Sequence, residues 1–417
     1  MENPKIRFKG FTKDWEQRKL GEVLISLQNN TLSRADLSNE RGIAKNVHYG
    51  DVLIKFGDVL DVSREQLPMI TDEKILDKYK ASFLQNGDVI IADTAEDTTV
   101  GKCSEIAGLR DEVVLSGLHT IPYRPVEKFA TGYLGYYLNS SAYHDQLIPL
   151  MQGIKVTSIS KSAMQDTDVV YPKSTEEQAM IGSYFQSLDN IITLHQRKCE
   201  QTKKLKKYML QKMFPQNGEK VPEIRFDGFT YDWEQRKVGE LLEERNEQAP
   251  MSEDYPLMAF IANQGVTQKG ERYDRSALVN DETGKKYKRT EFGDFIYSSN
   301  NLETGSIGLN KYGNACISPV YSIFKSTGKA ELDFLGRRFL RKDFINEMVK
   351  WRQGVVYGQW KIHETDFMKI EVRIPSVDEQ KKIGLYFDSL DNLITLHQRK
   401  CDELKKMKKY MLQNMFI

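Results

Sequence analysis

Short polar stretches that contain glycine occur in both halves of this chain and carry its candidate chemistry. In the first half they are residues 94–102 and 152–157, and in the second half they are residues 298–305 and 353–361. Hydroxyl, amide and ammonium groups in such loops can hydrogen-bond to base edges and phosphates, although ordinary surface loops have the same composition. The side chains that we expect to contact nucleic acid are Thr94, Thr98, Thr99, Lys102, Lys155, Thr157, Ser299, Asn300, Asn301, Tyr357, Gln359 and Lys361.

Motifs of catalysis are absent from the sequence. There is no GxxxxGK[ST] phosphate loop, no GxSxG, no HExxH, and no FxGxG with the Asn/Asp-Pro-Pro-aromatic run of adenine methyltransferases. The four cysteines lack CxxC spacing, and we interpret Cys199 and Cys401 as reduced helix residues rather than a disulfide or metal pair. We therefore expect no catalytic residue, no metal site and no cofactor in this chain.

Length and composition indicate a soluble protein with at least two domains. The chain has 417 residues, of which 29% are charged, and a net charge of +1. This balance argues against a uniformly basic nucleic-acid coat but allows a local basic stripe. The sequence has no secretory start and no apolar run of about 18 residues, so we expect a cytoplasmic protein with no membrane partner.

The elements that must position the candidate loops are written twice. Residues 4–24 return at 222–242 with 16 of 21 positions identical, and residues 178–214 return at 380–416 with 27 of 37 identical. The segments between these blocks are largely different. A duplicated scaffold with two dissimilar inserts predicts one molecule that reads two different targets.

The second repeated block predicts two long helices, over 174–214 and 376–417. Apolar residues recur at spacings of three and four, and Ser174 with Glu177, like Ser376 with Glu379, fits a capping box. One apolar stripe on each helix predicts a coiled coil; the chain path favours antiparallel pairing, while the seam residues alone leave parallel pairing open. We expect the two histidines to set its register. The predicted seam residues are Leu188, Ile192, His195, Leu205, Met209, Leu390, Ile394, His397, Leu404 and Met411.

The divergent segments, about 25–173 and 243–373, are predicted to share one strand-rich fold. A turn and strand at 83–91 recur at 291–297, and strands at 119–123 recur at 321–325. The predicted fold class is α+β, with two similar mixed domains separated by two long helices in a pseudo-twofold repeat.

Two further repeated features favour structural roles. Trp15 and Trp233 are expected to pack inside the protein rather than to stack on bases. The lysine clusters near the helix C-termini fit a solvated face that complements the helix dipole, with phosphate or partner contact as the alternative. These clusters are Lys203, Lys204, Lys206 and Lys207, and Lys405, Lys406, Lys408 and Lys409.

The chain resembles the specificity subunits of type I restriction–modification enzymes over essentially its whole length. The resemblance rests on the repeated IRFxGFTxDWEQRKxGE opening, the proline-to-Glu-Gln stretch at 172–178 and 375–380, and the LDNxITLHQRK helix segment. It implies target-recognition domains at 1–173 and 222–375, spacer helices at 174–214 and 376–417, and a linker at 215–221.

The resemblance also implies a function. In that family each recognition domain reads one half of a split, asymmetric site in double-stranded DNA, and an antiparallel coiled coil fixes the unread spacer. Two methyltransferase subunits dock on the helices and methylate adenine with S-adenosylmethionine, and restriction subunits that use ATP and Mg join them. The chain itself would then be non-catalytic. The alternatives are a coiled-coil adaptor that does not read DNA and, in a third class, a self-sufficient nuclease or methyltransferase.

Overall fold

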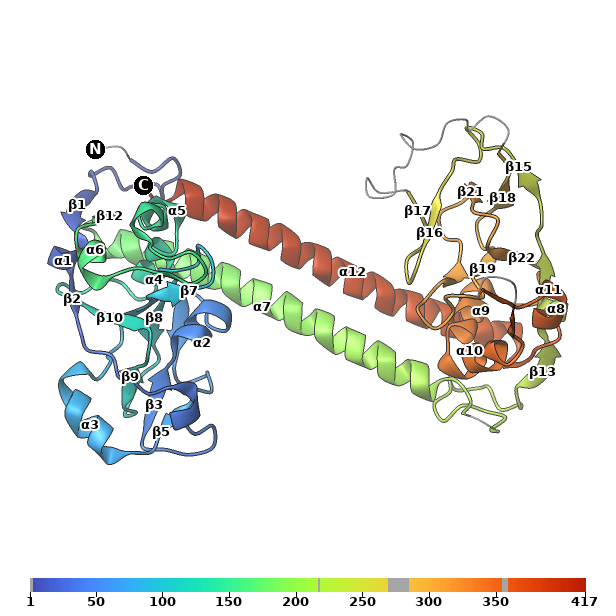
Figure 1. The fold of residues 1–417 in the computed structure, drawn as a ribbon, viewed down its shortest axis with the longest axis horizontal. Coiled ribbons are helices and arrows are strands. Elements are labelled where there is room, and N and C mark those ends of the chain that lie inside the picture. The colour runs from blue at the N-terminus through green and yellow to red at the C-terminus, as the bar shows by residue number, and fades with distance from the viewer. Residues whose placement is uncertain (1–2, 217, 269–284, 355–358) are drawn as a thin grey trace. The chain divides into compact units, whose positions relative to one another are not determined.

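The chain divides into two compact units that share both long helices. The computed structural model describes residues 3–216, 218–268, 285–354 and 359–417. The first unit is Met1–Arg197 with His397–Ile417, and the second is Lys198–Leu396. Helices α7 (Thr175–Lys212) and α12 (Val377–Asn414) therefore each contribute one portion to each unit (Figure 1).

The globular part of the first unit, the first domain, is built on a five-stranded sheet of order β2-β10-β6-β8-β4. Strand β6, with the sequence VIIA, is buried along its whole length, as a continuous apolar run predicts for a central strand. A three-stranded sheet of order β5-β3-β9 and the pairs β1-β12 and β7-β11 complete it. The strands are β1 (Glu16–Lys19), β2 (Leu24–Ser26), β3 (Ala44–Val47), β4 (Val59–Asp61), β5 (Met69–Ile70), β6 (Val89–Ala92), β7 (Thr94–Ala95), β8 (Cys103–Ala107), β9 (Val114–Ser116), β10 (Thr120–Pro125), β11 (Thr157–Ser158) and β12 (Asp168–Tyr171). The helices are α1 (Leu20–Val23), η1 (Arg34–Asp36), α2 (Tyr49–Ile54), α3 (Glu73–Tyr79), η2 (Lys80–Ser82), α4 (Tyr133–Leu138), α5 (Ser141–His144), η3 (Ile148–Leu150) and α6 (Lys161–Gln165).

The second domain repeats the centre of this architecture. Its four-stranded sheet has the order β14-β22-β19-β20, which corresponds strand for strand to β2-β10-β6-β8. The pair β13-β25 corresponds to β1-β12. The strands are β13 (Glu234–Lys237), β14 (Leu242–Glu244), β15 (Gln248–Ala249), β16 (Ala259–Ile261), β17 (Gly265–Thr267), β18 (Tyr287–Thr290), β19 (Phe295–Tyr297), β20 (Ile307–Leu309), β21 (Ala315–Ile317), β22 (Ser322–Ser326), β23 (Gln353–Gly354), β24 (Trp360–Lys361) and β25 (Glu371–Ile374). The helices are α8 (Val238–Leu241), α9 (Leu332–Phe339), α10 (Lys342–Val349) and α11 (Glu364–Phe367). The expectation that the divergent segments share one fold is confirmed.

Antiparallel pairing of α7 and α12 is confirmed within each unit. In the first unit, the Nδ1 atoms of His195 and His397 lie 2.9 Å apart. In the second unit, the Cys199 thiol donates to the backbone oxygen of Ile394, with Sγ 3.9 Å from that oxygen. The predicted seam is largely correct, because Leu188, Ile192, Leu390 and Leu404 are buried and Met209 and Met411 pack against the cores. The register role of the histidines stays a prediction.

Leu205 was a wrong seam assignment. It is 45% exposed, whereas Lys206, which follows it, turns inward and pairs with Asp391 of α12. A charged side chain can occupy a seam position when a carboxylate on the facing helix neutralises it, and apolar spacing alone does not reveal such a position.

Each domain core is completed by a phenylalanine that follows the end of a long helix. Phe416, after α12, packs with its ring centroid 6.4 Å from Trp15 and 5.8 Å from Phe185 in the first unit. Its repeat equivalent Phe214, after α7, lies 6.0 Å from Trp233 in the second unit. Both tryptophans are buried, which confirms that they pack inside the protein.

Candidate nucleic-acid interface

Two candidate stretches of the first domain lie side by side. Strand β7 pairs with β11, so that Ala95 opposes Thr157 and Thr94 opposes Ser158. A bridge between Gln152 and Ser158 closes a hairpin, and Lys155 projects from it into solvent. Thr94, Lys155 and Thr157 thus belong to one surface, although 61 residues separate strands β7 and β11 in sequence.

Two other candidates of the first domain differ in what their side chains contact. Thr99 hydrogen-bonds through its side chain and backbone to Asp97, which lowers the pKa of that carboxyl, while Thr98 is exposed. The Nζ of Lys102 donates to the backbone oxygens of Leu53, at 2.8 Å, and Phe56, at 3.2 Å. Burial lowers the pKa of Lys102. Lys102 therefore supports the end of α2, and its contact with nucleic acid stays a prediction.

The second domain also brings its two candidate stretches together, but by side-chain hydrogen bonds instead of a strand pair. The side-chain oxygen of Asn300 accepts from the backbone N–H of Trp360 at 2.6 Å, and the Ser299 hydroxyl accepts from Ile362 at 3.0 Å. Strand β23 pairs with β24, with Gln353 opposite Lys361. Asn301 and Gln359 are exposed beside them, and Tyr357 lies outside the described residues.

Lys361 is held by a local ion pair. Its Nζ lies 2.7 Å from a carboxylate oxygen of Glu364. Burial alone would raise the pKa of Glu364, but hydrogen bonds from Lys361 and Ser322 lower it. A phosphate would compete with this carboxylate for the same ammonium group.

Two apolar side chains stand out on these surfaces and were not among the predicted contacts. Ile154 at the tip of the first hairpin is fully exposed, and Trp360 on β24 is about half exposed. Large apolar side chains in solvent beside polar loops are typical of surfaces that bind something. Their exposure depends on the strand pairing, which the sequence pattern alone did not define.

The repeated opening block fastens each domain to the start of a long helix. Arg7 makes a two-point contact with the buried carboxylate of Glu177, at 2.6 and 2.9 Å. Arg225 and Glu379 repeat it at 2.7 and 2.7 Å in the second unit. The predicted capping boxes are only half formed: the serine accepts from the glutamate N–H, but the glutamate side chain binds arginine instead.

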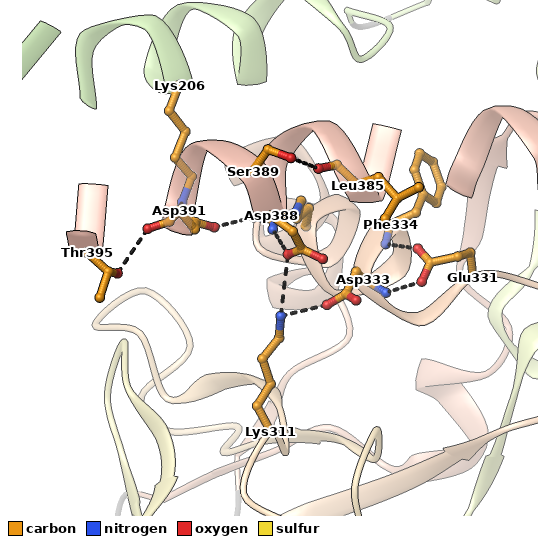
Figure 2. Close-up of polar contacts among 11 residues, drawn as sticks. Lys206, Lys311, Glu331, Asp333, Phe334, Leu385, Asp388, Ser389, Asp391 and Thr395 are labelled. Carbon is orange, nitrogen blue, oxygen red and sulfur yellow. Dashed lines mark hydrogen bonds and ion pairs between the residues drawn. The ribbon is translucent and has the colours of Figure 1, made fainter. Parts of the chain in front are cut away.

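The lysine clusters are not uniformly solvated faces, contrary to the favoured interpretation. Lys408 is mostly buried and contacts Asp58, at 2.7 Å, and Asp189, at 2.6 Å. Its repeat equivalent Lys206 pairs with Asp391 in the second unit (Figure 2). Lys408 thus links the first domain to α7, whereas Lys206 links the two helices to each other.

The paired helices also expose apolar side chains. In the first unit these are Ile191, Leu194, Met407 and Tyr410, and in the second unit their repeat equivalents are Leu393, Leu396, Leu205 and Tyr208. By the heptad register of the seam, they lie on one flank of the helix pair. Each unit therefore presents an equivalent apolar flank to solvent.

Over the described residues, no three His, Cys, Asp or Glu side chains come together in a group that could hold a metal ion. Within the same ranges, no helix has both the length and the apolar character that a membrane span requires.

Known proteins share both the sequence pattern and the fold. The type I restriction modification DNA specificity domain matches residues 12–204 and again residues 231–406. The Methanocaldococcus jannaschii protein named as type I restriction enzyme MjaX specificity subunit is 23% identical over 420 residues, covering 96% of this chain and 92% of that protein. The crystal structure of a type I restriction–modification system S subunit from M. genitalium aligns with a TM-score of 0.60 at 13% identity, covering 100% of this chain and 99% of that one. Two similar domains and a pair of antiparallel helices, as predicted, are confirmed.

Proposed function

Because the chain belongs to the type I restriction–modification DNA specificity family, we propose that it binds a bipartite, asymmetric site in double-stranded DNA. The first domain reads one half-site and the second domain reads the other. One observation carries this proposal: the two domains share a sheet order, and each joins its two candidate loops, but the side chains on those loops differ. Two unlike surfaces on one scaffold favour two unlike half-sites.

Two identical partners suit the apolar flanks of the helices. Repeat-equivalent side chains form an equivalent flank in each unit, so two copies of one protein can bind them in the same way. We assign these flanks to two methyltransferase subunits, which restriction subunits join. Ile191 and Met407 would lie within the contact in the first unit.

The chain contributes recognition and its partners contribute chemistry. The sequence lacks the motifs of nucleotide binding and adenine methylation, which agrees with S-adenosylmethionine, ATP and Mg binding in the partner subunits. The complex would act on DNA in the cytoplasm.

A gel-shift experiment with genomic fragments separates this function from that of an adaptor. The chain assembled with its methyltransferase subunits should retain one class of fragment at a salt concentration that removes the others. An adaptor would give no fragment-specific shift, with or without the methyltransferase. Ile191→Glu with Met407→Glu should abolish assembly, whereas Arg197→Glu, on the outer face of α7, should not. If the double variant still assembles with the methyltransferase subunits, the apolar flank is not their binding surface.

A further inference from the structure

A network of charges joins the second domain to both long helices. Asp391 of α12 contacts Lys206 of α7, and it accepts from Nη1 of Arg337 on α9 at 3.0 Å. The other terminal nitrogen of Arg337, Nη2, donates to Asp388, one turn earlier on α12. Lys311 lies 2.6 Å from Asp333 and 3.8 Å from Asp388. Figure 2 shows Lys206, Lys311, Asp388 and Asp391 converging from three parts of the unit.

The first unit has the same lysine–aspartate pair between the helices, but a different domain residue contacts the aspartate. Lys408 and Asp189 are the repeat equivalents of Lys206 and Asp391, and they pair in the same way. The hydroxyl of Tyr136 on α4 donates to Asp189 at 2.8 Å. The sequence YLGYYL at 133–138 aligns with FLGRRF at 334–339, which places Tyr136 where the second domain has Arg337.

A second difference compensates the first. The repeat equivalent of Asp388 is Gln186, which lines the same groove as Tyr136 and Lys408. The first unit therefore combines a neutral Tyr136 with a neutral Gln186, and the second combines a cationic Arg337 with an anionic Asp388. The two charge changes cancel at positions that are in contact in the second unit and line one groove in the first.

We propose that Gln186 and Asp388 match each domain to its own place on the helices. The first seat is Gln186, Asp189 and Lys408, and the second seat is Asp388, Asp391 and Lys206. A domain with arginine at the Arg337 position fits the second seat, because its guanidinium finds two carboxylates there. On the first seat the guanidinium would find one carboxylate, that of Asp189.

The first domain is likewise a poor fit for the second seat. The first domain brings Asp58, which pairs with Lys408 in its own seat. On the second seat, Asp58 would meet Asp388 and Asp391 around the single charge of Lys206, without Arg337. Like charges that are partly buried together repel. The match concerns how the domains are held on the helices and does not depend on whether they read DNA.

A chimera tests the match in the full chain. Residues 243–373 replace residues 25–173, so that the second domain occupies both seats, and thermal unfolding is followed with and without the substitution Gln186→Asp. This substitution should raise the melting temperature of the chimera by about 3 °C, the effect of one partly exposed ion pair in a domain of this size. The same substitution in the native chain, where Tyr136 stands in place of an arginine, should not raise the melting temperature.

A cycle in the native chain keeps the inference testable if the chimera does not fold. Arg337→Tyr, Asp388→Gln and the double variant are compared by thermal unfolding. The double variant should be at least about 2 °C more stable than the sum of the single effects predicts, because it restores the neutral pairing of the first unit. Additive effects in this cycle would overturn the inference, as would a chimera that Gln186→Asp does not stabilise.

Discussion

Removal of one ring at the end of α12 should destabilise the first domain, although that residue is the second-last of the chain. Phe416 is 3% exposed, and its ring centroid lies 5.9 Å from Tyr133 and 5.5 Å from Tyr137. A buried Phe→Ala substitution costs about 3–5 kcal/mol, since it removes the contacts and leaves a cavity. In a domain of about 200 residues, each kcal/mol lowers the melting temperature by about 2–4 °C. Phe416→Ala should therefore lower the melting temperature of the first unit by about 10 °C.

Calorimetry combined with hydrogen exchange locates the effect. Protection should fall in β6 and β10 of the first domain and persist in β19 and β22 of the second. Tyr410→Ala, on the same helix but 57% exposed, is the matched control and should shift the transition by less than about 2 °C. Phe214→Ala should transfer the loss to the second unit. A Phe416→Ala chain that melts like the control would refute the inference that α12 completes the first core.

Three other predictions follow from the same contacts. Glu177→Gln removes the charged acceptor of Arg7 and should lower the free energy of unfolding by about 3 kcal/mol. Glu176→Gln, at an exposed position, should change it by almost nothing. Equal effects of the two substitutions would show that the Arg7–Glu177 contact does not stabilise the first unit. Burial raises the pKa of Glu105 to about 7 from 4.5, so between these pH values the native state holds a proton that the unfolded state has lost. The free energy of unfolding should therefore fall by about 3 kcal/mol as the pH rises from about 4.5 to 7. Glu105→Gln should flatten this profile in denaturation measured at several pH values, and an unchanged slope would assign the pH dependence to other groups. One heptad inserted in both α7 and α12 adds about 10 Å of helix. It should lengthen the unread DNA spacer by about three base pairs at ~3.4 Å each. If the complex still methylates sites with the original spacer, the helices do not set the spacer length.

Local pattern was sufficient where a short stretch of chain determines the structure. The apolar spacing of Leu188 and Ile192 predicted the seam, and the turn-and-strand pattern at 83–91 predicted the strand that forms at Val89–Ala92. Long-range partners determine the features that sequence missed. Glu177 forms half a capping box because Arg7, 170 positions away, takes its carboxylate. Lys206 replaces Leu205 in the seam because Asp391 faces it, and no apolar period records that charge.

The candidate loops illustrate the same limit. Composition nominated the stretches around Thr94 and Thr157 separately, and only the pairing of β7 with β11 shows that they form one surface. Lys102 was predicted to contact nucleic acid, and the sequence did not show that its ammonium group donates to two backbone oxygens of the same domain. Ile154 was overlooked because an isoleucine in a sequence does not show whether it is buried or at a loop tip.

Genome-wide mapping of methylated adenines tests the central claim most directly. It compares cells with the native chain, cells without it, and cells in which residues 25–173 come from another member of the family. The account predicts one bipartite, non-palindromic site that disappears without the chain, and a change in one half-site only after the exchange. Methylation that is independent of the chain, or an exchange that alters both half-sites, would contradict it.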